Sequence, residues 1–155
     1  MRKIIFRSLS RWGSSLNRGE EISNYIRTCG YNSTYYDVVD EFATIRLTEN
    51  VKDSVVVLLK FIDMSEFEML RQHNNKVIID VIDCIANNEY TIEEICQAPF
   101  DGVIVPTEKL AITAKRLNPR LEVGVLYHHW DKKHLKNIEY YKQTEEYLFR
   151  LAYIG

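Results

Sequence analysis

The sequence predicts one α/β domain with an open, mostly parallel, Rossmann-like sheet of about six strands and helices on both faces. Short apolar segments rich in β-branched residues alternate along the chain with stretches of helical periodicity, and this alternation is typical of βαβ units. The segment Val-Val-Val-Leu-Leu at 55–59 is apolar throughout, as expected of a strand that is buried on both faces. A length of 155 residues fits one domain of ordinary size.

Six segments are predicted to be strands, because each is a short run of apolar residues bounded by turn or polar residues. The second segment has the weakest pattern. In chain order the predicted strands are residues 3–9, 33–39, 54–60, 76–82, 102–106 and 121–127. Parallel sheets of this kind bind ligands outside the carboxyl ends of the strands, where the strand order reverses. We therefore expect functional residues in the loops that follow these strands.

Four helices are predicted between the strands, at residues 16–29, 64–73, 91–98 and 107–117. The starts of the last three carry residues that favour helix N-caps. Asp63 or Ser65 is expected to cap the second helix, and Thr107 the fourth. Thr91 and Glu94 have the spacing of a capping box at the start of the third. The polar, tyrosine-rich stretch 131–150 is predicted to be helical for part of its length.

Composition excludes several classes of protein. Hydrophobic residues make up 46% of the chain and charged residues 27%, as in ordinary globular domains. The net charge of −2 provides no electrostatic footprint for nucleic acid. No segment approaches the roughly 20 apolar residues of a membrane span, and the apolar run at the amino terminus is interrupted at Arg7, too early for a signal peptide.

Cysteine usage agrees with a cytoplasmic location. Cys29, Cys84 and Cys96 are scattered and form neither a CxxC pair nor a zinc-binding spacing. Such isolated cysteines are typical of reduced thiols in a cytosolic protein. We predict a cytoplasmic protein with no cofactor and no metal ion.

The loop after the first predicted strand is rich in glycine and serine and leads into a helix. Such a loop can present backbone N–H groups to an anion. It matches neither the GxGxxG fingerprint nor a P-loop, so a simple turn with a helix cap is an equal interpretation. Two arginines favour binding, because a guanidinium fork suits phosphate or carboxylate. The candidate ligand-binding residues are Arg11, Gly13, Ser14, Ser15 and Arg18.

Charged residues also occur at the ends of the third and fourth predicted strands. Lys60 comes directly after five apolar residues, and it either faces the ligand crevice or extends into solvent. Asp80 and Asp83 point to opposite faces of a strand unless the strand ends between them. They are therefore no natural acid–base pair, and we expect one to cap a turn while the other reaches the crevice.

Two adjacent histidines, His128 and His129, follow the last predicted strand. At most one of them faces a given site if the strand continues through them. A histidine near a carboxylate such as Asp131 can act as an acid or a base near neutral pH. A metal site formed with His134 is less favoured, because the spacing matches no established set of ligands.

Several of these segments occur in a familiar order. The sequence opens with the strand 3–9, and Gly-Ser-Ser-Leu-Asn-Arg-Gly at 13–19 then leads into a helix. After the strand 77–83 come Phe-Asp-Gly-Val-Ile-Val-Pro-Thr at 100–107 and His-His-Trp-Asp at 128–131. In this order the motifs resemble the amino-terminal half of GT-B glycosyltransferases, which have two Rossmann-like domains. The resemblance covers nearly the whole chain and depends on the order of the motifs.

The resemblance implies transfer of a sugar from a nucleotide sugar to an acceptor in a cleft between two domains. The amino-terminal domain of such enzymes mainly holds the acceptor, and the second domain carries the nucleotide contacts. Residues 1–131 are then expected to form the amino-terminal domain, and 132–155 a helical tail that leads into the start of a missing second domain. The expected partners are a sugar acceptor, a nucleotide sugar, and a second domain or partner chain. The domain alone is expected to be incomplete or inactive.

The resemblance also implies roles for individual residues. His128 or His129 is expected near the reacting centre as the catalytic residue. The loop 13–18 borders the cleft, and Lys60, Asp83 and Thr107 line the acceptor side.

A non-catalytic binding or regulatory protein that retains the Rossmann-like fold is the alternative. Tyrosines are frequent at protein interfaces, and the tail carries Tyr140, Tyr141, Tyr147 and Tyr153. These tyrosines form an interface in that case, or they pack across the domain's own helices. A small nucleotide-binding enzyme of the flavodoxin-like type is less favoured, because the first loop lacks a phosphate-binding fingerprint.

Overall fold

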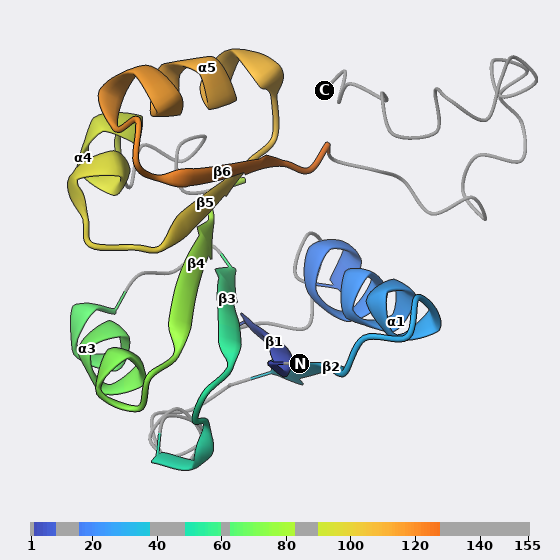
Figure 1. The fold of residues 1–155 in the computed structure, drawn as a ribbon. Coiled ribbons are helices and arrows are strands. Elements are labelled where there is room, and N and C mark those ends of the chain that lie inside the picture. The colour runs from blue at the N-terminus through green and yellow to red at the C-terminus, as the bar shows by residue number, and fades with distance from the viewer. Residues whose placement is uncertain (1, 9–15, 38–48, 60–62, 83–89, 128–155) are drawn as a thin grey trace, which may run out of the picture.

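A computed structural model describes residues 2–8, 16–37, 49–59, 63–82 and 90–127 of the chain. In these ranges strands and helices alternate in the predicted order (Figure 1). The strands are β1 (Ile4–Ser8), β2 (Ser33–Asp37), β3 (Val55–Leu59), β4 (Lys76–Asp80), β5 (Gly102–Val105) and β6 (Glu122–Val125). The helices are α1 (Glu21–Thr28), α3 (Met64–Gln72), α4 (Ile92–Gln97) and α5 (Glu108–Leu117), and a π-helical turn, η1 (Leu16–Glu20), precedes α1. None of the helices in these ranges is long and apolar enough to cross a membrane.

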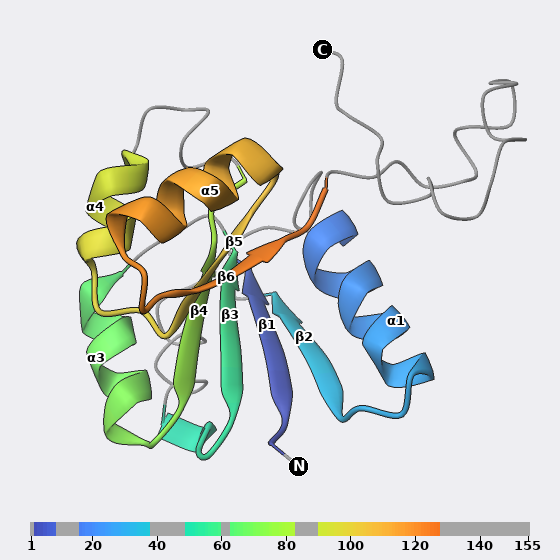
Figure 2. The ribbon, with the colours of Figure 1, turned by 45° about the horizontal axis from the view of Figure 1, so that its top comes forward.

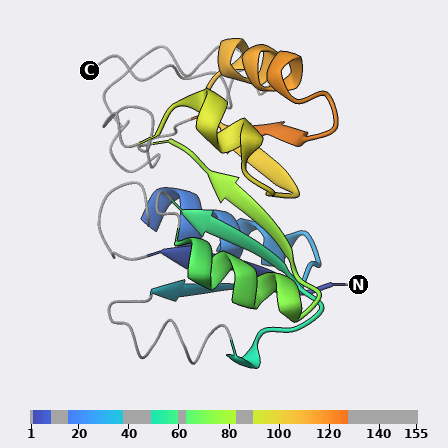
Figure 3. The same cartoon turned by 90° about the vertical axis from the view of Figure 1, so that its left-hand side faces the viewer.

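All six strands are parallel and form one sheet in the order β2-β1-β3-β4-β5-β6. Figure 3 shows the arrowheads of β1 to β4 on the same side of the sheet. The α/β class with an open, parallel, Rossmann-like sheet is therefore confirmed. From β1 the chain continues to β2 on one side and then returns to β3 on the other, so the strand order reverses between β1 and β3.

Helices lie on both faces of the sheet (Figure 2). Successive side chains of a strand point to opposite faces. Val56 and Leu58 of β3 therefore belong to the larger core, which contains side chains of α3, α4 and α5. Val57 and Leu59 point to the other face and pack in a smaller cluster with side chains of α1. Burial on both faces explains why β3 is apolar at every position.

The predicted N-caps are found at the starts of three helices. Of the two residues predicted for α3, Asp63 is the cap, and Thr107 caps α5 as predicted. Both hydrogen bonds of the capping box of α4 are present. The Glu94 backbone N–H donates to the Thr91 hydroxyl at 3.2 Å, and the Thr91 N–H donates to the Glu94 carboxylate at 2.7 Å.

This capping box predicts a pH dependence of stability. The hydrogen bonds from Thr91 hold the pKa of Glu94 below its ordinary value of 4.5. A carboxylate with a lowered pKa in the folded state stabilises the fold above its unfolded-state pKa, and this contribution is lost as the pH falls through the folded pKa. We expect the Glu94→Gln variant to lose less stability than the native protein between about pH 6 and about pH 3, measured by urea denaturation. The Glu93→Gln variant, outside the box, is the control, and equal pH dependence of native and Glu94→Gln would contradict the prediction.

Two of the three cysteines fall within the described ranges, and both are free thiols. Cys29 is exposed, whereas Cys96 is buried in the larger core. Burial, with a smaller contribution from Glu93, raises the pKa of the Cys96 thiol and makes it less reactive. Cys84 lies outside the described residues.

Candidate functional site

Two buried arginine–carboxylate pairs lie near the carboxyl ends of the central strands. Arg7 of β1 pairs with Glu66 in the first turn of α3. Arg18 of η1 pairs with Asp80, the last residue of β4. None of these four residues is more than 2% exposed. Charged residues are almost never fully buried unless they are paired, so the two pairs mark the polar part of the domain interior.

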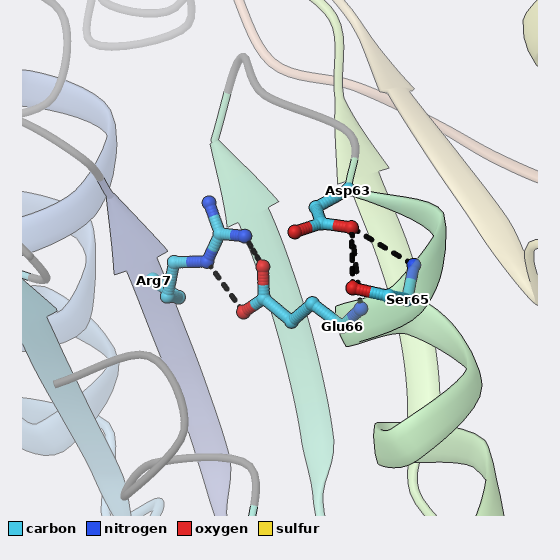
Figure 4. Close-up of polar contacts among 4 residues, drawn as sticks. All are labelled: Arg7, Asp63, Ser65 and Glu66. Atoms are coloured by element: carbon cyan, nitrogen blue, oxygen red, sulfur yellow. Dashed lines mark hydrogen bonds and ion pairs between the residues drawn. The ribbon is translucent and has the colours of Figure 1, made fainter. Parts of the chain in front are cut away.

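The first pair joins β1 to α3. Arg7 lies two residues after Ile5 and so points to the same face, the one covered by α3. Its Nε donates to Glu66 Oε1 at 2.7 Å, and its Nη2 contacts Oε2 (Figure 4). Burial lowers the pKa of Arg7 to about 10, against the effect of the nearby Asp63 carboxylate, which raises it. The guanidinium is therefore charged at neutral pH, and the contact is an ion pair.

The second pair connects three parts of the fold. Arg18 donates from Nε and Nη2 to the two carboxylate oxygens of Asp80, at 2.8 and 2.9 Å. Its Nη1 donates to the Leu126 carbonyl at 2.5 Å. Through these contacts Arg18 holds the turn before α1 against the end of β4 and the residue that follows β6. The sequence predicts a ligand contact for Arg18. Every guanidinium nitrogen already has a protein partner, and that contact stays a prediction.

Gly19 lets η1 lie directly on the sheet. A Cβ atom at this position would stand 2.5 Å from Cε2 of Tyr35 on β2 and 2.7 Å from Cδ1 of Leu59 on β3. Real Cβ atoms do not approach other heavy atoms this closely, so a larger residue would force the side chains of Tyr35 and Leu59 to move. The close approach of η1 brings the neighbouring Arg18 within reach of Asp80.

Replacing Gly19 with alanine is expected to lower the free energy of unfolding by about 1–3 kcal/mol, because the added methyl group overpacks the contact between η1 and the sheet. The measurement is urea denaturation. Gly124→Ala is the matched control, since a Cβ atom there would meet Ile104 at 3.8 Å, an ordinary contact. Equal losses of stability in the two variants would show that a methyl group fits at position 19 as well as at position 124.

Most residues that the sequence nominates for function lie outside the described part of the chain. These are Arg11, Gly13, Ser14, Ser15, Lys60, Asp83, His128 and His129. Thr107 is described and exposed, and its hydroxyl accepts the Leu110 N–H at 3.2 Å as the cap of α5. It lies two residues after the end of β5, at the same carboxyl edge of the sheet to which Arg18 is bound.

Sequence reasoning missed the pair of Arg7 and Glu66. The available signal was the position of Arg7, a charged residue within an apolar strand, because a buried charge requires a partner. Asp80 is likewise a charged residue at the end of a buried strand, and its ion pair with Arg18 accounts for its burial. Asp80 also accepts the Ile82 N–H at 3.2 Å, so it makes the expected turn contact as well.

Comparisons with known proteins assign no family: no family model, no curated protein and no solved structure matches the chain. The class of the protein is therefore defined by its fold and by the geometry of the site. The chain contains an open, parallel, Rossmann-like α/β domain with two buried ion pairs at the carboxyl edge of its sheet. Within the described ranges, no three His, Cys, Asp or Glu side chains come together in a group that could hold a metal ion.

Proposed function

We propose that this domain is the acceptor-side half of a GT-B type glycosyltransferase and binds a sugar at the carboxyl edge of its sheet. The observation that best supports the proposal is a polar cluster formed by Arg7, Glu66 and Asp63. It lies next to the point where the strand order reverses. Open parallel sheets bind their ligands at this point. The order of the sequence motifs indicates that the substrate is a sugar. The guanidinium and carboxylate groups of the polar cluster are suited to hydrogen-bond with sugar hydroxyls.

The proposed reaction needs a second, nucleotide-binding domain and a base on the acceptor side. The bond between the sugar's anomeric carbon and the nucleotide phosphate breaks, and a bond to the acceptor oxygen forms. His128 or His129 is proposed to remove the acceptor proton, since histidine titrates near neutral pH. Arg18 donates a hydrogen bond to the Leu126 carbonyl, two residues before His128 in the sequence, so the chain enters this segment from the carboxyl edge of the sheet.

A thermal-shift experiment tests the proposal. A ligand that binds only the folded state raises the unfolding temperature, by the equivalent of about 2.7 kcal/mol at a concentration 100 times its Kd. We expect simple acceptor sugars to raise it, and nucleotides to have a smaller effect, because the second domain carries the nucleotide contacts in such enzymes. If no sugar shifts the unfolding temperature at millimolar concentration, the proposal is wrong.

A non-catalytic binding or regulatory protein is the second candidate. This candidate is favoured by Arg18, because all three of its guanidinium nitrogens already donate to protein acceptors. A sugar-transfer assay with a nucleotide sugar, a candidate acceptor and the partner half distinguishes the two candidates. Binding of the acceptor without turnover supports the non-catalytic protein, whereas turnover excludes it.

A further inference from the structure

We propose that Arg7 and Asp63 form a subsite for a hydroxyl group of a carbohydrate, between the end of β1 and the start of α3. The inference rests on the proposed function and deepens it by assigning a place and a pair of residues to the sugar. Four side chains meet there, and Figure 4 shows them: Arg7, Asp63, Ser65 and Glu66.

Arg7 supplies a hydrogen-bond donor that has no acceptor in the described structure. Its Nε and Nη2 are used by Glu66, but Nη1 is buried without a hydrogen-bond partner. In Figure 4 the third nitrogen points away from Glu66. A buried donor left unsatisfied costs about 1–3 kcal/mol, and more when the group is charged. Native proteins rarely keep such a group without a reason, and a bound molecule that supplies an acceptor is one such reason.

Asp63 supplies an acceptor near the Arg7 guanidinium, on the side of Nη2 in Figure 4. Its Oδ1 accepts from the N–H and hydroxyl of Ser65, each at 2.8 Å, and from the Glu66 N–H at 3.5 Å. No hydrogen bond to the other oxygen, Oδ2, occurs among the described residues. Asp63 also raises the pKa of Arg7 by its charge, so the two groups are close enough to interact. Asp63 is only half-buried, which gives the subsite an open side.

The charges at this place favour an uncharged ligand group. Glu66 neutralises Arg7, and Asp63 adds a further negative charge. A phosphate or carboxylate would lie near two carboxylates, and like charges repel strongly in a partly buried site. A hydroxyl group is neutral and both accepts and donates, so the hydroxyl groups of one ligand can satisfy a donor such as Arg7 Nη1 and an acceptor such as Asp63 Oδ2. Sugars carry several hydroxyl groups, so a carbohydrate matches the donor, the acceptor and the charge of the subsite.

The test uses the full chain, a panel of neutral methyl glycosides, and two anionic probes, inorganic phosphate and glucuronate. Asp63→Ser removes Oδ2 but keeps a residue that favours the N-cap position. We expect this variant to bind the best methyl glycoside about tenfold more weakly or worse, because a hydrogen bond to a charged group is lost. We expect Arg7→Lys, which lacks the guanidinium fork, to weaken binding similarly. Thr91→Ser, an exchange of the N-cap of α4, is the matched control and should bind like the native protein.

Two readouts separate a failed subsite from a failed function. In nitrogen NMR spectra of the native protein, the glycoside should shift the Arg7 side-chain signal while phosphate does not. If the glycoside raises the unfolding temperature but folded Asp63→Ser binds it with native affinity, the subsite is wrong and the proposed function stands. Stronger effects of phosphate or glucuronate on Arg7 also overturn the subsite. If no glycoside binds the native protein, the subsite and the proposed function both fail.

Discussion

Replacing Arg18 with methionine is expected to lower the free energy of unfolding by about 3–5 kcal/mol, because the change removes the Arg18 cation from the buried Asp80 carboxylate. Asp80 is 1% exposed, so bulk water does not solvate its charge in the native fold. The Leu126 carbonyl loses its hydrogen bond from Nη1 in the same variant. Urea denaturation at neutral pH measures the loss as a lower midpoint.

The matched control is Arg71→Met. Arg71 also pairs with a carboxylate, that of Asp101, at 2.6 Å. The side chains of this pair are 44% and 27% exposed, and exposed ion pairs contribute only about 0–1 kcal/mol. If Arg71→Met destabilised the protein as much as Arg18→Met, burial of the Arg18 pair would not be the cause of its effect.

The Glu66→Leu substitution is expected to have a cost of similar size, about 3–5 kcal/mol, because it leaves the buried Arg7 cation without its ion-pair partner. Arg7 has 0% exposure and is charged at neutral pH. Without Glu66, its Nε and Nη2 lose their acceptors along with the ion pair. The measurement is again urea denaturation at neutral pH.

The double variant Arg7→Met/Glu66→Leu provides the control for this prediction. Replacement of a buried ion pair by apolar side chains of similar volume is often neutral or stabilising, so the double variant should recover most of the stability that Glu66→Leu loses. Such strong non-additivity is expected of two residues in direct contact. If the double variant were less stable than Glu66→Leu, the pair would contribute to stability beyond mutual charge compensation.

The elements of the fold could be predicted because their signals are local. The apolar run of β3 and the capping box at Thr91 each depend on a few neighbouring residues, and both are confirmed. The first helix was predicted as one element over 16–29, whereas the structure has the turn η1 followed by α1. Gly19 of η1 lies against Tyr35 of β2 and Leu59 of β3, and no local pattern could reveal contacts with these distant strands.

The ion pairs could not be predicted, because their partners meet only after the strands are ordered in the sheet. Arg18 and Asp80 are 62 residues apart, and Arg7 and Glu66 are 59 apart. No helical or strand periodicity relates residues at such separations. Of the nominated site residues, Arg18 and Thr107 are described, and the ligand roles of the whole set stay predictions.

The hydrogen bond from Arg18 to the Leu126 carbonyl has a consequence for biosynthesis. The two residues are 108 positions apart, so the bond cannot form until nearly the whole domain has been synthesised. Protein chains fold as they emerge, amino-terminal part first, and contacts of large sequence separation form slowly. On the ribosome, the hydrogen bond from Arg18 in η1, the turn before α1, can therefore form only after β6 and Leu126 have been synthesised. Late protection of the Arg18 Nη1 protons from hydrogen exchange would show when this bond forms during synthesis.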